Sequence, residues 1–293
     1  MRSGDEHYRD EDIGRALGLP GAGILAWLTA DQLHPPMLND DAMWRDGNQW
    51  KWGACRYVAE LGSLAGIQPG DKVLDIGCGL CGPARLLVDN FGASVTAITN
   101  SKAHAATSQE LNSRNARHCA QITVQHVQGI EYWPDGPYSA AWSLNMLYQV
   151  PDHQELFGKV CNLLRPGGRF LLDDWMATDS ITECDLQIFR HHFQYRNLLK
   201  VSSVESELIA AGFYPAERMV DRGQVGRGPM KQHFETVMRE HFLPKISEAW
   251  PDDCGVAVSG NQMVKDFTEA VGHTLDLYSA GKLTYRTLVA GKR

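Results

Sequence analysis

Short runs of β-branched and apolar residues alternate with stretches of helical periodicity from residue 72 onward. The runs predict seven strands, at residues 72–76, 94–99, 121–127, 138–144, 169–174, 214–220 and 283–291. The periodic stretches predict helices at residues 83–91, 103–116, 152–164 and 202–212. Strand–helix alternation at this spacing is typical of a mostly parallel sheet with helices on both faces, so the fold class is α/β. Such sheets bind ligands beyond the carboxyl ends of their strands.

A long N-terminal segment precedes the predicted sheet, and two inserts interrupt it. Residues 1–70 are polar and mostly helical in pattern, with a tryptophan cluster, and are predicted to form an N-terminal helical extension. Residues 71–293 are predicted to form the α/β domain, with inserts at about residues 175–200 and 222–280. We expect both inserts to fold over the carboxyl edge of the sheet as a lid.

Composition restricts the kind of partner. The formal net charge is −7 and the 28 Lys and Arg residues form no runs, so neither a nucleic acid nor an anionic membrane surface is expected. The apolar stretch at residues 21–30 is short and follows an acidic lead, which predicts neither a membrane span nor a signal peptide. Seven irregularly spaced cysteines predict no disulfide framework and favour a cytoplasmic location. We therefore expect a small-molecule partner.

The loop "DIGCGLCG" at residues 75–82 contains a Cys-x-x-Cys pair, Cys78 and Cys81. A redox pair would need a loop that is free to open, with the first cysteine at a helix N-terminus. A zinc site would need two further ligands, and the nearest other cysteine, Cys119, has no partner beside it. We therefore expect the two cysteines to be small side chains in a tight turn, and we expect no metal.

The same loop contains a Gly-x-Gly-x-x-Gly run, which by itself is a weak signal for a dinucleotide site. The full fingerprint has an acid at the end of the next strand, where Thr99 and Asn100 stand instead, so a nicotinamide cofactor is disfavoured. Asp75 favours another ligand, because its carboxylate would repel a pyrophosphate but could hold an ammonium group. S-adenosylmethionine carries an ammonium group and no phosphate, and the glycines would let the backbone approach it closely.

Around this loop the sequence resembles a known family. "VLDIGCGLCGPARLL" and "FGASVTAITNS" resemble the cofactor region of class I S-adenosylmethionine-dependent methyltransferases. "WKWG", "LLRPGGRFLLDDW" and the tail "LYSAGKLTYRTLVAGKR" extend the likeness to sterol, tocopherol and terpenoid C-methyltransferases and to cyclopropane fatty acid synthases. The likeness covers the chain from about residue 43 to its end. It implies a Rossmann-like fold with a seven-stranded, mostly parallel sheet, an enzyme that transfers methyl groups, and S-adenosylmethionine as its cofactor.

The resemblance also implies which residues surround the cofactor. In chain order these are Asp75, Gly77, Gly79, Thr99, Asn100, His104, Ile130, Glu131 and Leu144. The first three would surround the amino acid end, and the next three would face the ribose, with His104 where the subgroup has a glutamine. Ile130 would pack on the adenine, and Glu131 would accept a hydrogen bond from its amine, in a segment that resembles the "GWE" of the cyclopropane synthases.

The fourth strand is followed by a departure from the family. Relatives often have an acid and a histidine facing the acceptor there, and this chain has Tyr148 and Gln149. An amine or an electron-rich alkene can attack a methyl group without a strong base, whereas an alcohol usually needs one, so the change favours carbon or nitrogen as acceptor. If a base is used, the first insert offers His191 or His192, with Tyr148 or an acid orienting it; a surface or structural role is the alternative for both histidines.

Aromatic residues could line the acceptor pocket, because aromatic faces stabilise the carbocation that methylation of an alkene leaves. The candidates are Trp50, Trp52, Tyr148, Trp175 and Tyr195. Packing in the core or lid is an equally open alternative for each of them.

The predicted function is S-adenosylmethionine-dependent methyl transfer to carbon or nitrogen of a small, partly apolar metabolite, such as an isoprenoid or an alkaloid. Three alternatives stay open: an O-methyltransferase with an insert histidine as base, a non-methylating cyclase on the same scaffold, and an oxidoreductase supported by the glycine run alone. Exposed aromatic residues in the extension also predict a homo-oligomer.

Overall fold

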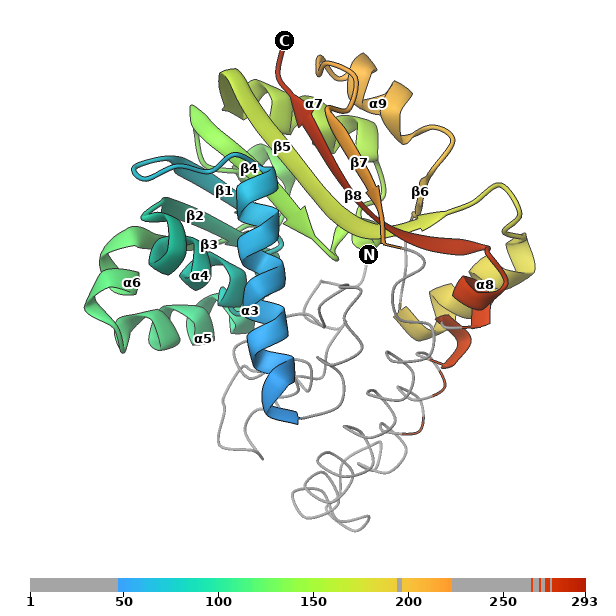
Figure 1. The fold of residues 1–293 in the computed structure, drawn as a ribbon, viewed down its shortest axis with the longest axis horizontal. Helices are drawn as coiled ribbons and strands as arrows, with labels where there is room; N and C mark the ends of the chain where they lie inside the picture. The colour runs from blue at the N-terminus through green and yellow to red at the C-terminus, as the bar shows by residue number, and fades with distance from the viewer. Residues whose placement is uncertain (1–46, 194–196, 223–264, 266–268, 270–271, 275) are drawn as a thin grey trace.

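A single mixed sheet forms the centre of the fold (Figure 1). The computed structural model describes residues 47–193, 197–222, 265, 269, 272–274 and 276–293. Within these residues, seven strands follow the order β3-β2-β1-β4-β5-β8-β7, and an eighth, β6, pairs with β5 outside that path. The strands are β1 Lys72–Ile76, β2 Ser94–Thr99, β3 Ile122–His126, β4 Tyr138–Leu144, β5 Leu164–Ala177, β6 Leu199–Lys200, β7 Arg218–Asp221 and β8 Leu283–Gly291. β1 to β5 pair in parallel, and β8 runs antiparallel to β5 and β7. The predicted α/β class and mostly parallel sheet are confirmed.

Helices flank the sheet on both sides (Figure 1). They are α3 Gly47–Leu64, α4 Gly82–Phe91, α5 Lys102–Ser113, α6 Ala116–Gln121, α7 His153–Leu163, α8 Glu183–Phe193 and α9 Val204–Ala210, with short 3₁₀ turns η3 Ile130–Tyr132 and η4 Leu147–Gln149. Successive strand residues point to opposite faces, which builds two hydrophobic cores. On the first, the α3 face, Val73 and Leu171 pack with Leu61 and Leu87 of α3 and α4. On the second, the α7 face, strand residues pack with α7 and α9 through Leu74, Phe170, Leu172, Leu156, Val160, Val204 and Leu208.

Three elements differ from their predicted bounds by more than two residues. β5 begins at Leu164 and includes the predicted "RPGG" turn, and it continues to Ala177, so Trp175 lies in the sheet. β7 begins only at Arg218, because Pro215 cannot donate to a strand ladder. The predicted helix at 103–116 is two helices, since the side chain of Asn115 caps a new one. The division into an extension and a domain with two inserts stays a prediction.

A buried polar network joins α3 to the sheet on the α3 face. The fully buried Asp173 of β5 accepts hydrogen bonds from three hydroxyls, those of Tyr57, Tyr285 and Thr287. Arg222 donates to Thr287 Oγ1 at 3.1 Å and to Glu60 of α3 at 2.6 Å. Burial raises the pKa of Asp173 to about 6, and the hydroxyl donors oppose part of that rise. The network therefore fixes α3 relative to β5 and β8.

Candidate functional site

The carboxyl ends of β1 and β2 meet at one edge of the sheet, where residues 77–81, the glycine loop, lead from β1 to α4. The amides of Gly77 and Cys78 donate to the carbonyl of Ile98 in β2, at 2.9 and 3.0 Å. The hydroxyl of Ser108 in α5 donates to the carbonyl of Gly79 at 3.0 Å. The loop is therefore held between β2 and α5. Gly77 has a positive φ of 76°, and a Cβ added to it would stand 2.4 Å from Cγ of Met146.

Asp75 lies at the end of β1 and is buried, with 3% of its surface exposed. Burial raises the pKa of Asp75 to about 7, and the neighbouring Trp142 lowers it in part. Its Oδ2 has no hydrogen-bond partner among the described residues. A buried oxygen of this kind is unfavourable in the protein alone, and a ligand that brings a positive charge and N–H donors would satisfy it. The loop and its acid thus fit the ammonium end of the predicted cofactor.

The two cysteines of the loop are both buried. The pKa of Cys78 lies well above its usual value, because its thiol hydrogen-bonds with Cys81, because it is buried, and because Asp75 is near. Thiols with raised pKa values are poor nucleophiles. The surroundings favour small core side chains over a redox pair. In the part of the chain that the structure describes, no group of three or more His, Cys, Asp or Glu side chains could hold a metal ion.

The residues predicted to face the ribose follow β2, next to the glycine loop. Thr99 is buried, and its hydroxyl accepts a hydrogen bond from the amide of Ser101 at 3.2 Å, so it stabilises the turn into α5. Asn100 is exposed at this edge. His104 is half-buried in the first turn of α5, and its amide donates to the capping hydroxyl of Ser101. The structure thus brings the three residues together but gives the Thr99 hydroxyl a structural partner.

The residues predicted for the adenine lie in η3, which follows β3. Ile130 is half-buried and Glu131 is exposed. The Glu131 carboxylate lies against Gly129, where an added Cβ would stand 2.4 Å from its Oε2. Leu144 ends β4 in register with Asp173 of β5. Because Asp75 is in register with Trp142, Leu144 lies on the same face of the sheet, one pleat closer to the carboxyl edge.

Tyr148 lies in η4, just beyond β4, and is half-buried against the core of the α3 face. Its hydroxyl accepts a hydrogen bond from Nε2 of Gln149 at 3.2 Å. The two side chains that replace the family's acid and histidine therefore contact each other.

An aromatic cluster lies farther along the α3 face. The ring of Trp175 meets Tyr278 and Tyr285 edge-on, with centroids 5.6 and 5.1 Å apart. On the side of the ring that faces the two tyrosines, these contacts favour a packing role over acceptor binding. The Trp175 residue as a whole is only half-buried. Sequence reasoning missed Tyr278 and Tyr285. The alternation of the predicted strand at residues 283–291 places Tyr285 and Thr287 on one face and could have indicated the second tyrosine.

For the remaining predicted site residues, the structure gives at most the helix to which each belongs. Trp50 and Trp52 belong to α3, and His191 and His192 belong to α8. Tyr195 lies outside the described residues. Their predicted roles in acceptor binding and catalysis stay predictions.

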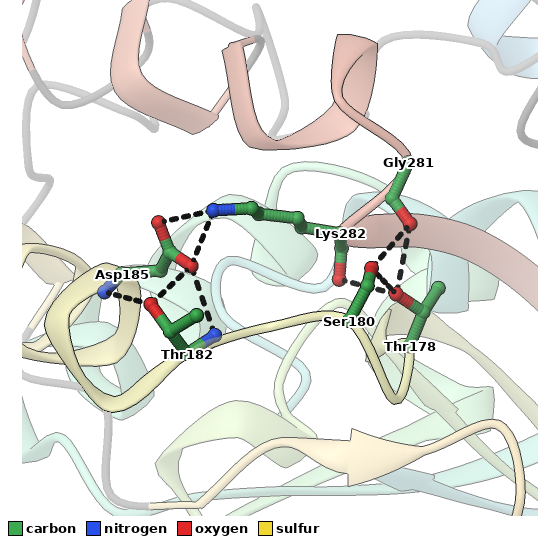
Figure 2. A network of polar contacts seen from close by, with 6 residues as sticks. All are labelled: Thr178, Ser180, Thr182, Asp185, Gly281 and Lys282. Atoms are coloured by element: carbon green, nitrogen blue, oxygen red, sulfur yellow. Dashed lines mark hydrogen bonds and ion pairs between the residues drawn. The ribbon is translucent and has the colours of Figure 1, made fainter.

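Figure 2 shows a polar network that joins the start of α8 to the residues before β8. Nζ of Lys282 donates to both carboxylate oxygens of Asp185, at 2.9 and 2.7 Å. Asp185 and Thr182 cap the start of α8 reciprocally, and Thr178 donates to the carbonyl of Gly281 at 2.8 Å. Lys282 first, and then Thr182, lower the pKa of Asp185 to about 2. The segment that leaves β5 and the segment that returns to β8 are therefore tied together.

Replacing Lys282 with methionine should loosen this tie while keeping the apolar stem of the side chain. We expect amide exchange at residues 182–185 to become several-fold faster. The melting temperature should fall by roughly 2–4 °C, because a partly exposed ion pair contributes up to about 1 kcal/mol. The effect should be present at pH 7 and disappear as the pH falls from about 4 to 2, where Asp185 becomes protonated. The exposed Lys200, replaced with methionine, is the control; equal exchange in both variants would contradict the assigned tie.

No helix among the described residues has the length and apolar character needed to cross a membrane. The fold and its glycine loop define the class of the protein, the open α/β sheets. Members of this class bind ligands at the carboxyl edge of their strands. Within this class, the chain belongs to the mycolic acid cyclopropane synthetase family, whose sequence model matches residues 56–268. This membership confirms the predicted resemblance.

Individual relatives and solved structures have less than 30% sequence identity to this chain. The 2-methyl-6-phytyl-1,4-hydroquinone methyltransferase of Synechocystis sp. is 29% identical over 157 residues, which are 54% of this chain and 48% of that protein. The match thus spans about half the length of this relative. A putative sarcosine dimethylglycine methyltransferase from Galdieria sulphuraria has a similar fold, with a TM-score of 0.74, 20% identity and coverage of 92% and 97% of the two chains. Geranyl diphosphate C-methyltransferase from Streptomyces coelicolor, in complex with S-adenosyl-L-homocysteine, follows with a TM-score of 0.67, 17% identity and coverage of 89% and 90%.

Proposed function

We propose that this chain binds S-adenosylmethionine at the carboxyl edge of the sheet and transfers its methyl group to carbon or nitrogen of a small, partly apolar metabolite, such as an isoprenoid. The observation that carries the proposal is the buried carboxylate of Asp75, with one unpartnered oxygen behind a glycine loop. An ammonium group would pair with this carboxylate, and a phosphate would be repelled by it. Family membership supports the same cofactor.

The cofactor supplies a methyl group on a sulfonium that is already a good leaving group, so the protein needs mainly to align donor and acceptor and to exclude water. The described residues of the β4 end provide a tyrosine and a glutamine, and neither is a strong base at neutral pH. This supports an acceptor that attacks without one. The substrates named for the relatives, a phytyl hydroquinone and geranyl diphosphate, support a partly apolar acceptor.

Titration calorimetry with S-adenosylmethionine and S-adenosylhomocysteine tests the cofactor, and mass spectrometry of small molecules bound to the purified protein tests the acceptor. We expect both cofactor forms to bind and labelled methyl to appear in a product. Absence of binding by both would end the proposal. Binding without demethylation in step with product would favour the cyclase alternative. A cytoplasmic location and self-association stay predictions from the sequence.

The part played by Tyr148 can be separated into its ring and its hydroxyl. If its ring stabilises a cationic intermediate, Tyr148→Phe should keep the methyl transfer rate within about threefold, because the aromatic face is retained. Tyr148→Ala should lower kcat by about 10- to 30-fold, since a desolvated cation–π contact contributes about 2 kcal/mol. Rates are measured with labelled S-adenosylmethionine and the acceptor found by mass spectrometry. A large loss in Tyr148→Phe alone would instead assign the hydroxyl to proton transfer and favour the O-methyltransferase alternative.

A further inference from the structure

Residues 145–149, the β4 loop, connect the two halves of the proposed site. At one end, Met146 packs against Gly77 of the glycine loop, as the 2.4 Å distance from an added Cβ to Met146 Cγ shows. At the other end, the loop carries Tyr148. The position of this short segment therefore sets how the cofactor side and the acceptor side are aligned.

Asp174 of β5 holds the first half of the β4 loop. Its Oδ2 accepts hydrogen bonds from the amide of Met146 at 2.8 Å and from the amide of Leu147 at 2.7 Å. Its Oδ1 accepts one from the amide of Trp175 at 2.8 Å. The side chain is fully buried, so water does not compete for these bonds.

All three partners of Asp174 are N–H donors, and only a carboxylate accepts from three of them. An asparagine has one oxygen, and its NH₂ group would face an N–H donor. In the described part of the chain no ion pair includes Asp174, and a buried charge without a counterion is unfavourable. Burial raises the pKa of Asp174 to about 7, and the amide donors oppose that rise. Three converging N–H groups, two of them from the β4 loop, therefore stabilise the carboxylate in place of a counterion and hold the loop to β5.

The second half of the β4 loop is held from two other elements. Nε2 of the buried His153 donates to the carbonyl of Leu147 at 3.0 Å, and burial lowers the pKa of this imidazole. The amide of Asn197, which lies beyond α8, donates to the carbonyl of Tyr148 at 3.3 Å. Backbone groups at three consecutive residues of the loop are therefore bonded to β5, to α7 and to the segment after α8.

We propose that Asp174 is a positioning residue, whose carboxylate fixes the β4 loop so that the glycine loop and Tyr148 are aligned before a ligand binds. This inference rests on the proposed function, because it assigns the loop a part in holding the cofactor. Binding to a fixed loop involves no loss of loop entropy, whereas binding to a loose one subtracts the free energy of ordering from the affinity.

The test compares Asp174→Asn with Asp173→Asn. The two residues are neighbours on one strand, both are buried carboxylates, and both variants lose one charge. They face opposite sides of the sheet, and Asp173 contacts hydroxyls, which can reverse their direction to suit an amide. Amide exchange at Met146 and Leu147 and the Kd for S-adenosylhomocysteine are measured in the full-length protein.

In the native protein, these two loop amides should exchange as slowly as amides of β4. In Asp174→Asn, their exchange should be more than tenfold faster, S-adenosylhomocysteine should restore the protection, and its Kd should rise about tenfold. Asp173→Asn should keep the native protection and a Kd within threefold of native. Equal behaviour of the two variants would overturn the proposal. If Asp174→Asn does not fold, the native protein alone tests the proposal, and fast exchange of its Met146 and Leu147 amides would overturn it. Failure of the native protein to bind S-adenosylhomocysteine would refute the proposed function, and slow native exchange would then still support a fixed loop.

Discussion

Replacing Asp75 with asparagine should weaken the binding of S-adenosylhomocysteine by about 10- to 100-fold, because the ammonium group loses a charged hydrogen-bond partner worth about 1.5–3 kcal/mol. The side chain keeps its shape, so the glycine loop should stay in place. Titration calorimetry at pH 8 measures the change. The exposed Asp135, also replaced with asparagine, is the control for loss of one negative charge.

The same substitution should stabilise the ligand-free protein. The pKa of Asp75 is about 7 in the folded chain and 3.8 in the reference state, so ionisation disfavours folding. The penalty is absent below about pH 4, grows as the pH rises to 7, and reaches at most about 4 kcal/mol above it. Asp75→Asn removes the penalty. At pH 8 the variant should therefore melt several degrees above the native protein, and at pH 4 the two should melt at the same temperature. A variant that binds less tightly and melts at a higher temperature would mark Asp75 as a ligand-binding residue.

Binding by the native protein should also depend on pH. An ammonium group binds the ionised carboxylate, so the affinity should fall by up to tenfold per pH unit below about 7, and Asp75→Asn should lose this dependence. His104 and Glu131 are further titratable side chains predicted to face the cofactor, and His104→Gln and Glu131→Gln should each keep the native pH dependence. A native affinity that is flat between pH 5.5 and 8 would show that Asp75 does not receive the ammonium group.

The strands with the clearest patterns have the bounds that the sequence predicts. β1, β2, β4 and β8 begin and end at the predicted residues, because each is an apolar run bounded by turn or charged residues. The glycine loop was also predictable, since its glycines, its acid and its neighbouring strand are contiguous in the chain. Local sequence was sufficient wherever local contacts determine the structure.

Asp173 and Asp174 show where local sequence was insufficient. Strand alternation predicts that the two side chains face opposite sides of the sheet. It does not predict that one accepts from hydroxyls of α3 and β8 and the other from amides of the β4 loop, because those partners are brought close only by the fold. The acceptor side of the site is even harder to predict from the sequence, because its predicted residues come from separate segments. No contiguous motif encodes how these segments pack.

Replacing Gly77 with alanine should lower the free energy of unfolding by about 2–5 kcal/mol. A left-handed φ costs an alanine about 1–2 kcal/mol, and the forced contact with Met146 adds about 1–3 kcal/mol. Gly70→Ala is a matched control, because Gly70 also has a positive φ, of 84°, and an added Cβ would have no atom within 4 Å. This control should lose only about 1–2 kcal/mol, the backbone part. Urea denaturation of both variants measures the difference.

The contact with Met146 can be isolated further by a double-mutant cycle. Met146→Ala alone should destabilise the protein, because it removes packing, but in the Gly77→Ala background it should recover part of the loss by removing the clash. Gly77→Ala should also bind S-adenosylhomocysteine at least about tenfold more weakly, since a shift of about 1 Å in the loop moves the backbone away from the ligand. Equal losses of stability at Gly70 and Gly77 would mean that Met146 can move aside. The bonds from Asp174 hold the loop backbone, so rotation of the Met146 side chain would relieve the contact without loosening the β4 loop.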